Sequence, residues 1–150
     1  MSKKRIGALI GALLSLALLA YGCGGGDETT ALTRQQFINQ ANLICKKQRD
    51  RRNAKVAAAV QGRDQTKLLP LKVREDLVLE TIPDYEGAYE QISELGAPDG
   101  DEERIDEIVE AMEESAQKVK AQPAQALVST KQFQRANELS AEYGLSECLS

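Results

Sequence analysis

The chain has 150 residues, with 19 lysines and arginines against 23 aspartates and glutamates, and it contains no histidine. Its net charge of −4 argues against nucleic-acid binding, because that interaction depends on basic side chains that neutralise phosphates. Without histidine the usual general base and a common zinc ligand are missing, so we expect a non-catalytic protein with no cofactor and no metal site.

Residues 1–22 have the layout of a secretory signal peptide. Basic residues at 3–5 precede an apolar run over 6–20, and the small residue Gly22 stands before Cys23. The run is about 15 residues long, whereas a helix needs about 20 to cross a bilayer. We therefore expect the leader to be removed, which takes the net charge from −4 to about −7. An uncleaved leader that acts as a weak anchor is the alternative.

Cys23 follows this leader directly. The stretch LAYGC at 19–23 resembles the lipobox of bacterial lipoproteins, in which a small residue precedes the cut and the cysteine thiol takes a diacylglyceryl group. Each buried methylene contributes about 0.8 kcal/mol, so two acyl chains on Cys23 would anchor the protein firmly. We expect an extracytoplasmic protein that is anchored to the outer face of the cell membrane by this lipid. Ordinary secretion after cleavage nearby is the alternative.

Residues 23–32 have the composition of a flexible tether. They include three consecutive glycines at 24–26 and show no periodicity. When extended, residues 24–32 reach at most about 30 Å, so the folded part would lie close to the membrane. The predicted domain covers 33–150, which is long enough to bury a single core.

The first predicted helix begins at Thr33. A threonine three residues before Gln36 has the spacing of a capping box, in which each side chain bonds the other's backbone N–H. The inner face then follows at steps of three and four residues, and it continues towards Gly62, a plausible stop. Its expected members are Phe37, Ala41, Ile44, Cys45, Gln48, Val56, Ala59 and Val60.

A second apolar stripe passes through Pro83 without losing its phase. Proline inside a helix removes one hydrogen bond and bends or ends the helix. We predict one helix over 71–95 that is bent at Pro83, with two helices meeting there as the alternative. Its inner stripe is Leu71, Val78, Ile82, Tyr85, Tyr89 and Ile92.

Two further helices are predicted after the loop at 96–100. An acidic helix runs from Asp101 to the Gln122–Pro123 break, and a last helix runs from about Ser129 to Tyr143. Gly144 can take the left-handed conformation that closes a helix, with Leu145 as the hydrophobic contact. The inner positions are Ile105, Ile108, Val109, Met112, Ala116 and Val119, then Phe133, Ala136, Leu139 and Tyr143. Since strand-like alternation is absent from the sequence, the predicted fold is all-α, an antiparallel bundle of about four helices.

Three stretches carry a resemblance to a known group. FINQANLIC at 37–45, ELGAP at 94–98 and YGLSEC at 143–148 resemble a group of small predicted lipoproteins exported by high-GC Gram-positive bacteria. The resemblance covers about 33–148. It implies the helical architecture and the pairing of the two cysteines in these stretches, and it implies no activity.

The two remaining cysteines are expected to form a disulfide. With Cys23 lipidated, an exported chain keeps only Cys45 and Cys148, and disulfides persist outside the cytoplasm. Cys45 faces inward on the first helix, and the turn at Gly144 can bring Cys148 back over the bundle. Two unpaired buried thiols are the alternative.

Charged residues of opposite sign are separated along the chain. Six basic residues surround the single acid Asp50 on the first helix, namely Lys46, Lys47, Arg49, Arg51, Arg52 and Lys55. They could bind an anionic partner such as lipid head groups or an acidic polymer. A solvated face attracted by the acidic segment is the simpler interpretation. The acids of 99–114 likewise indicate a solvated face, with a weak calcium site at 98–103 as the alternative.

Tyr85 and Tyr89 flank the expected bend and could line a small pocket. The favoured function is a membrane-anchored, non-catalytic helical interaction module that binds a protein or anionic polymer of the cell envelope. The alternative is a small-ligand-binding lipoprotein with its site near these two tyrosines. A cavity beside them would favour the ligand, whereas a closed core with an outer patch would favour the interaction module.

Overall fold

The computed structural model describes residues 31–64 and 67–150. Within these residues all regular structure is helical, which confirms the all-α prediction. The signal peptide at 1–22, the lipidation site Cys23 and most of the tether lie outside the described residues. The α-helices are α1 Arg34–Val60, α2 Leu71–Glu94, α3 Glu102–Ala121, α4 Pro123–Ala126 and α5 Gln134–Tyr143, and the 3₁₀ turns are η1 Lys131–Phe133 and η2 Ser146–Cys148.

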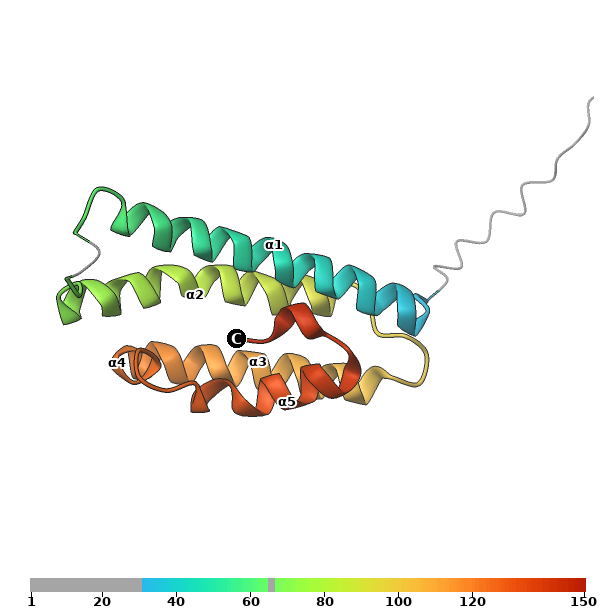
Figure 1. The fold of residues 1–150 in the computed structure, drawn as a ribbon. Helices are drawn as coiled ribbons and strands as arrows, with labels where there is room; N and C mark the ends of the chain where they lie inside the picture. Colours follow the sequence, from blue (N-terminus) through green and yellow to red (C-terminus); the bar gives the residue numbers. More distant parts are fainter. Residues whose placement is uncertain (1–30, 65–66) are drawn as a thin grey trace, which may run out of the picture.

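The helices form two packed pairs. The long helices α1 and α2 lie side by side, and α3 lies beside α2 with α5 on its other side (Figure 1). After α5 the chain turns back, and η2 packs against α1, so that the last residues lie between the two pairs (Figure 1). The C-terminal segment therefore closes the bundle.

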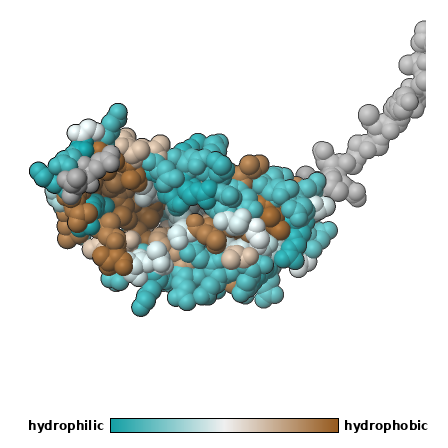
Figure 2. Space-filling model, in the orientation of Figure 1, coloured by the Kyte–Doolittle hydropathy of each residue, from teal (hydrophilic) through white to brown (hydrophobic). Residues whose placement is uncertain are grey.

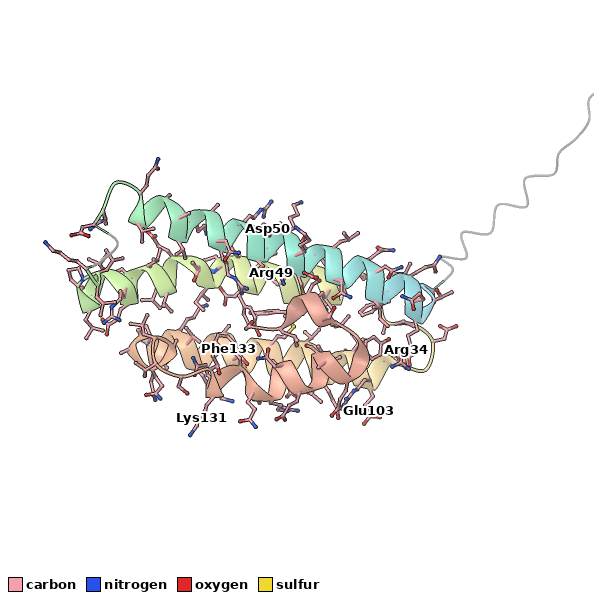
Figure 3. All side chains as sticks on the ribbon, in the orientation of Figure 1. Arg34, Arg49, Asp50, Glu103, Lys131 and Phe133 are labelled. Atoms are coloured by element: carbon pink, nitrogen blue, oxygen red, sulfur yellow. A yellow bond between two sulfur atoms is a disulfide. The ribbon has the colours of Figure 1, made fainter. Side chains whose placement is uncertain are left out.

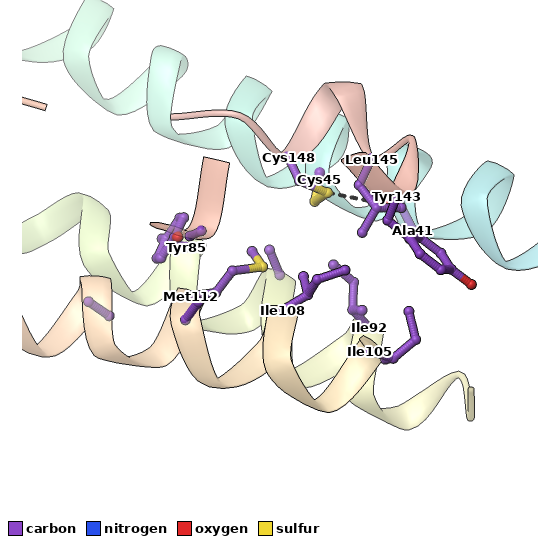
Figure 4. Packing of buried hydrophobic residues seen from close by; sticks show 14 of the residues in the cluster. Ala41, Cys45, Tyr85, Ile92, Ile105, Ile108, Met112, Tyr143, Leu145 and Cys148 are labelled. Carbon is purple, nitrogen blue, oxygen red and sulfur yellow. Dashed lines mark hydrogen bonds between the residues drawn. A yellow bond between two sulfur atoms is a disulfide. The ribbon is translucent and has the colours of Figure 1, made fainter. Parts of the chain in front are cut away.

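The start of α1 is as predicted. Gln36 N–H donates to Thr33 Oγ1 at 3.3 Å, and Thr33 N–H donates to Gln36 Oε1 at 2.9 Å, which completes the capping box. Phe37 and Ala41 are fully buried beyond it, and Figure 4 shows Ala41 and Cys45 at the core.

The inner face of α1 ends earlier than predicted. The buried positions stop at Gln48, and Val56, expected on the inner face, is 42% exposed. The reason is that η2 meets α1 at Asn42, Cys45 and Arg49, so the last turns of α1 have α2 as their main neighbour. Because only α2 covers this part of α1, the apolar stripe that continues to Val56 is partly exposed to solvent.

Helix α2 is continuous through Pro83, which confirms the single-helix prediction. Pro83 lies on the exposed side, while Ile82 and Tyr85 are buried. Leu71, predicted on the inner stripe, is 53% exposed. It occupies the first turn of α2, at the end of the bundle where few neighbours cover it.

The last predicted helix is shorter than expected. The chain forms α4 directly after the Gln122–Pro123 break, and α5 begins only at Gln134. Thr130 is not helical, and the Ser129 hydroxyl accepts from Lys131 N–H at 3.2 Å, which favours a turn over a continued helix.

The end of α5 agrees with the prediction. Gly144 adopts a φ of 100°, a conformation that favours glycine, and Leu145 N–H donates to Ser140 O at 2.8 Å. Leu145 is then fully buried, and Figure 4 shows it beside Tyr143 and the disulfide. The cap thus directs the C-terminal segment back onto α1.

Candidate functional site

The predicted disulfide joins the first helix to the C-terminal segment. Cys45 and Cys148 are bonded with a Cα–Cα distance of 4.9 Å, across 103 positions of sequence (Figure 4). Asn42 supports the same junction, because its amide donates to Gly144 O at 3.1 Å and accepts from Glu147 N–H at 2.9 Å. The sequence analysis missed this role of Asn42, since its partners lie about 100 residues away.

The six basic residues of α1 do not form one surface. Lys46 pairs with Asp50 at 2.6 Å, Lys55 pairs with Asp84 at 2.6 Å, and Arg49 pairs with Glu147. Figure 3 shows Arg49 on the side of α1 that faces the C-terminal segment. The partners come from α1, α2 and η2, so the expected attraction to the acidic helix is wrong.

The other three basic residues differ in their surroundings. Lys47 and Arg51 are exposed, and Arg51 Nη1 donates to Gln48 Oε1 at 3.3 Å. Arg52 is half-buried, and its guanidinium carbon lies 5.8 Å from the centre of the Tyr85 ring. At that distance a guanidinium is attracted by the negative face of the ring.

A cavity of about 230 Å³ lies beside Tyr85. Tyr85 was predicted to line a pocket and does so, but Tyr89 does not line this cavity. Tyr89 instead contacts Tyr85 edge to face, with ring centres 6.3 Å apart. The residues that line the cavity come from α1, α2, α3, α4, η1 and the last position: Arg52, Val78, Thr81, Ile82, Tyr85, Val119, Ala126, Phe133 and Ser150.

The polar groups of the cavity are Arg52, Tyr85, Thr81 and Ser150. Burial raises the pKa of Tyr85 to about 12, although the nearby Ser115 hydroxyl and the Arg52 guanidinium partly oppose this shift. Burial also lowers the pKa of Arg52, against the opposing effect of Tyr85. Tyr85 therefore keeps its proton at neutral pH and can serve as a hydrogen-bond donor.

Most of this site could not be assigned from sequence. Phe133 packs edge to face on Tyr85 with ring centres 5.5 Å apart, yet the two residues belong to different predicted helices. Arg52 was grouped with surface cations because of its neighbours in sequence. Only its place on the turn of α1 that faces α2 distinguishes it from Arg51.

Asp101, at the start of the acidic helix α3, is hydrogen-bonded to the buried residue Tyr143. Tyr143 Oη donates to Asp101 Oδ2 at 2.7 Å, and the Arg34 guanidinium lies 4.5 Å from the centre of the Tyr143 ring. Figure 3 shows Arg34 at this end of the bundle. Burial and the bond to Asp101 raise the pKa of Tyr143. In residues 31–64 and 67–150, no cluster of three acidic or cysteine side chains could hold a metal ion.

Hydrophobic side chains are exposed at the opposite end of the bundle, where α1 is connected to α2 and where α4 lies. Figure 2 shows hydrophobic residues gathered over this end. We call the following set the distal apolar surface: Val56 at 42% exposed, Leu68 at 86%, Leu71 at 53% and Val128 at 78%.

These features define a class of protein: a small disulfide-tied helical bundle with a mainly apolar cavity beside Tyr85 and an exposed apolar surface at the far end of its described part. Comparison with known protein families, with curated proteins and with solved structures finds no match to this chain. Across the described segments, each helix is too short or too polar to span a lipid bilayer.

Proposed function

We propose that this protein is a lipid-anchored, extracytoplasmic interaction module of the cell envelope that binds a partner without catalysis. The anchor is the lipid on Cys23, at the end of the predicted signal peptide. A disulfide is compatible with export, because such bonds persist in oxidising surroundings.

The distal apolar surface is the observation that carries this proposal. Exposed apolar patches on small proteins commonly mark interaction sites. The described chain begins at Ala31, close to the start of α1, and the distal apolar surface lies at the other end of that helix (Figure 1). A tether at 23–32 would therefore attach the bundle by one end and direct the apolar end away from the membrane.

The partner proposed for this surface is a protein with an apolar patch. An anionic polymer or lipid would require unpaired cations, but three lysines near this end are paired locally. Lys55 pairs with Asp84, Lys72 pairs with Asp76, and Lys67 lies 3.8 Å from Asp64. Apolar contact, rather than net charge, would select the partner.

Photo-crosslinking in intact cells tests the docking surface. A photoreactive residue in place of Val128 is expected to give a discrete adduct with another envelope protein, identified by mass spectrometry. The same residue in place of Leu43, which is 68% exposed on α1, is the matched control and should give no such adduct. Equal labelling at both positions, an adduct of twice the chain's own mass, or no adduct at Val128 would contradict the proposal.

The lipid anchor has its own test. Cys23→Ser is expected to move the protein from the membrane fraction to the medium, or to leave the leader uncleaved, because serine cannot form the thioether. Fractionation followed by mass spectrometry of the N-terminus would distinguish the two. Wild-type protein that already fractionates as soluble would show that no anchor is present.

A second candidate function is small-ligand binding at the cavity beside Tyr85. The observation that favours it is a cavity of about 230 Å³ with mainly apolar walls and a few polar groups. That combination is typical of ligand sites, although this cavity is smaller than most of them.

A further inference from the structure

Arg52 is a half-buried cation that has no carboxylate partner among the described residues. The charged groups that act on it are Arg49 and Asp84, together with the Tyr85 ring. Asp84 is already paired with Lys55 at 2.6 Å, and Arg49 with Glu147. Removing a cation from water is costly unless an anion lies beside it. A negatively charged ligand next to the Arg52 guanidinium would therefore be stabilised.

The Tyr85 hydroxyl is a second unused donor at the same place. Tyr85 is only 4% exposed, and its hydroxyl oxygen has no hydrogen-bond partner within bonding geometry in the described part of the chain. The Ser115 and Ser150 hydroxyls lie near it, and Ser115 donates its own proton to Ala111 O at 2.7 Å, but neither hydroxyl is placed to bond Tyr85 Oη. A buried hydroxyl without a partner is destabilising, so a ligand oxygen that accepts its proton would be favoured.

Apart from Thr81 and Ser150, the remaining walls of the cavity are apolar. Val78 and Ile82 come from α2, Val119 comes from α3, and Phe133 closes the space from η1. Figure 3 shows Phe133 on the helix pair that lies across the bundle from α1. The volume of about 230 Å³ equals that of about eight water molecules, which is enough for a short alkyl chain or one ring.

We propose that this cavity binds a small amphipathic carboxylate, with its two oxygens on the Arg52 guanidinium and the Tyr85 hydroxyl and its apolar part between α2, α3 and η1. This inference rests on the second candidate function and names its ligand class. A carboxylate fits better than a phosphate, because one guanidinium and one hydroxyl match two oxygens and a single negative charge.

Three probes with the same tail test the ligand class: octanoate, 1-octanol and octylammonium. They are titrated by calorimetry into the full chain carrying Cys23→Ser, which has no lipid of its own to compete. Octanoate is expected to bind about 10 to 100 times more tightly than octanol, the range for a charge-assisted hydrogen bond. In the same background, Arg52→Gln should remove this preference while octanol binding is retained.

Two further variants are controls. Arg51→Gln changes an exposed neighbour and should leave octanoate binding unchanged, whereas Ala126→Phe should fill the cavity and abolish binding of all three probes. Circular dichroism checks that each variant is folded. Equal binding of octanoate and octanol, or preference for octylammonium, would overturn the carboxylate inference and leave the ligand function standing. If none of the three probes binds, both the carboxylate inference and the ligand-binding function are overturned.

Discussion

Replacement of Cys45 and Cys148 by alanine is expected to lower the free energy of unfolding by up to about 4 to 5 kcal/mol. The disulfide joins positions 103 residues apart, so it closes most of the folded chain into one loop. In the chain-entropy model, such a loop restricts the unfolded state more strongly than a short one would. Because small domains are stable by only about 5 to 15 kcal/mol, this loss would unfold much of the population on mild warming.

Urea denaturation followed by circular dichroism measures this loss. The wild type treated with reductant should show the same decrease as the double variant, since both lack the cross-link. Asn42→Ala provides a separate control, because it removes the hydrogen bonds to Gly144 and Glu147 and leaves the disulfide in place. A double variant within 1 kcal/mol of wild type would contradict the entropic argument.

Phe37→Ala is expected to cost about 3 to 5 kcal/mol, the usual range for removing a large aromatic side chain from a core. Phe37 is fully buried in the first turns of α1, and its ring meets that of Tyr143 edge to face with centres 6.0 Å apart. The substitution removes apolar burial and this ring contact together, and it leaves a cavity between α1 and α5.

The matched control is Leu43→Ala, on the same helix. Leu43 is 68% exposed, so its truncation should change the free energy of unfolding by less than about 0.5 kcal/mol. Both variants are measured by urea denaturation with the slope compared to wild type. If they cost the same, helix propensity rather than core packing would dominate at position 37.

Helix limits and buried faces could be predicted wherever the signal is local. The Thr33–Gln36 cap spans three residues, and the step from Phe37 to Ala41 to Cys45 is one helical turn each time. The closure at Gly144 depends on one left-handed residue. These features depend on backbone geometry within a few positions, so they can be read without knowing how the helices meet.

The predictions failed where burial depends on a neighbouring element. Val56 and Leu71 continue apolar stripes, but no element covers them fully at the distal end. Periodicity identifies a face that can be buried, and only packing decides whether another element lies against it. The last helix likewise begins late because a turn at Ser129 competes with helix formation.

By itself, the sequence determined the helical class, the capped start of the first helix, the continuity of α2 through Pro83 and the pairing of Cys45 with Cys148. These follow from short-range backbone geometry and from a count of cysteines. The tertiary structure alone decided that Arg52, Tyr85 and Phe133 share one cavity, and that Lys55 pairs with Asp84. Side chains far apart in the chain meet only when the helices pack, and the docked positions of α1, α2 and η1 are set by the whole core rather than by any one segment.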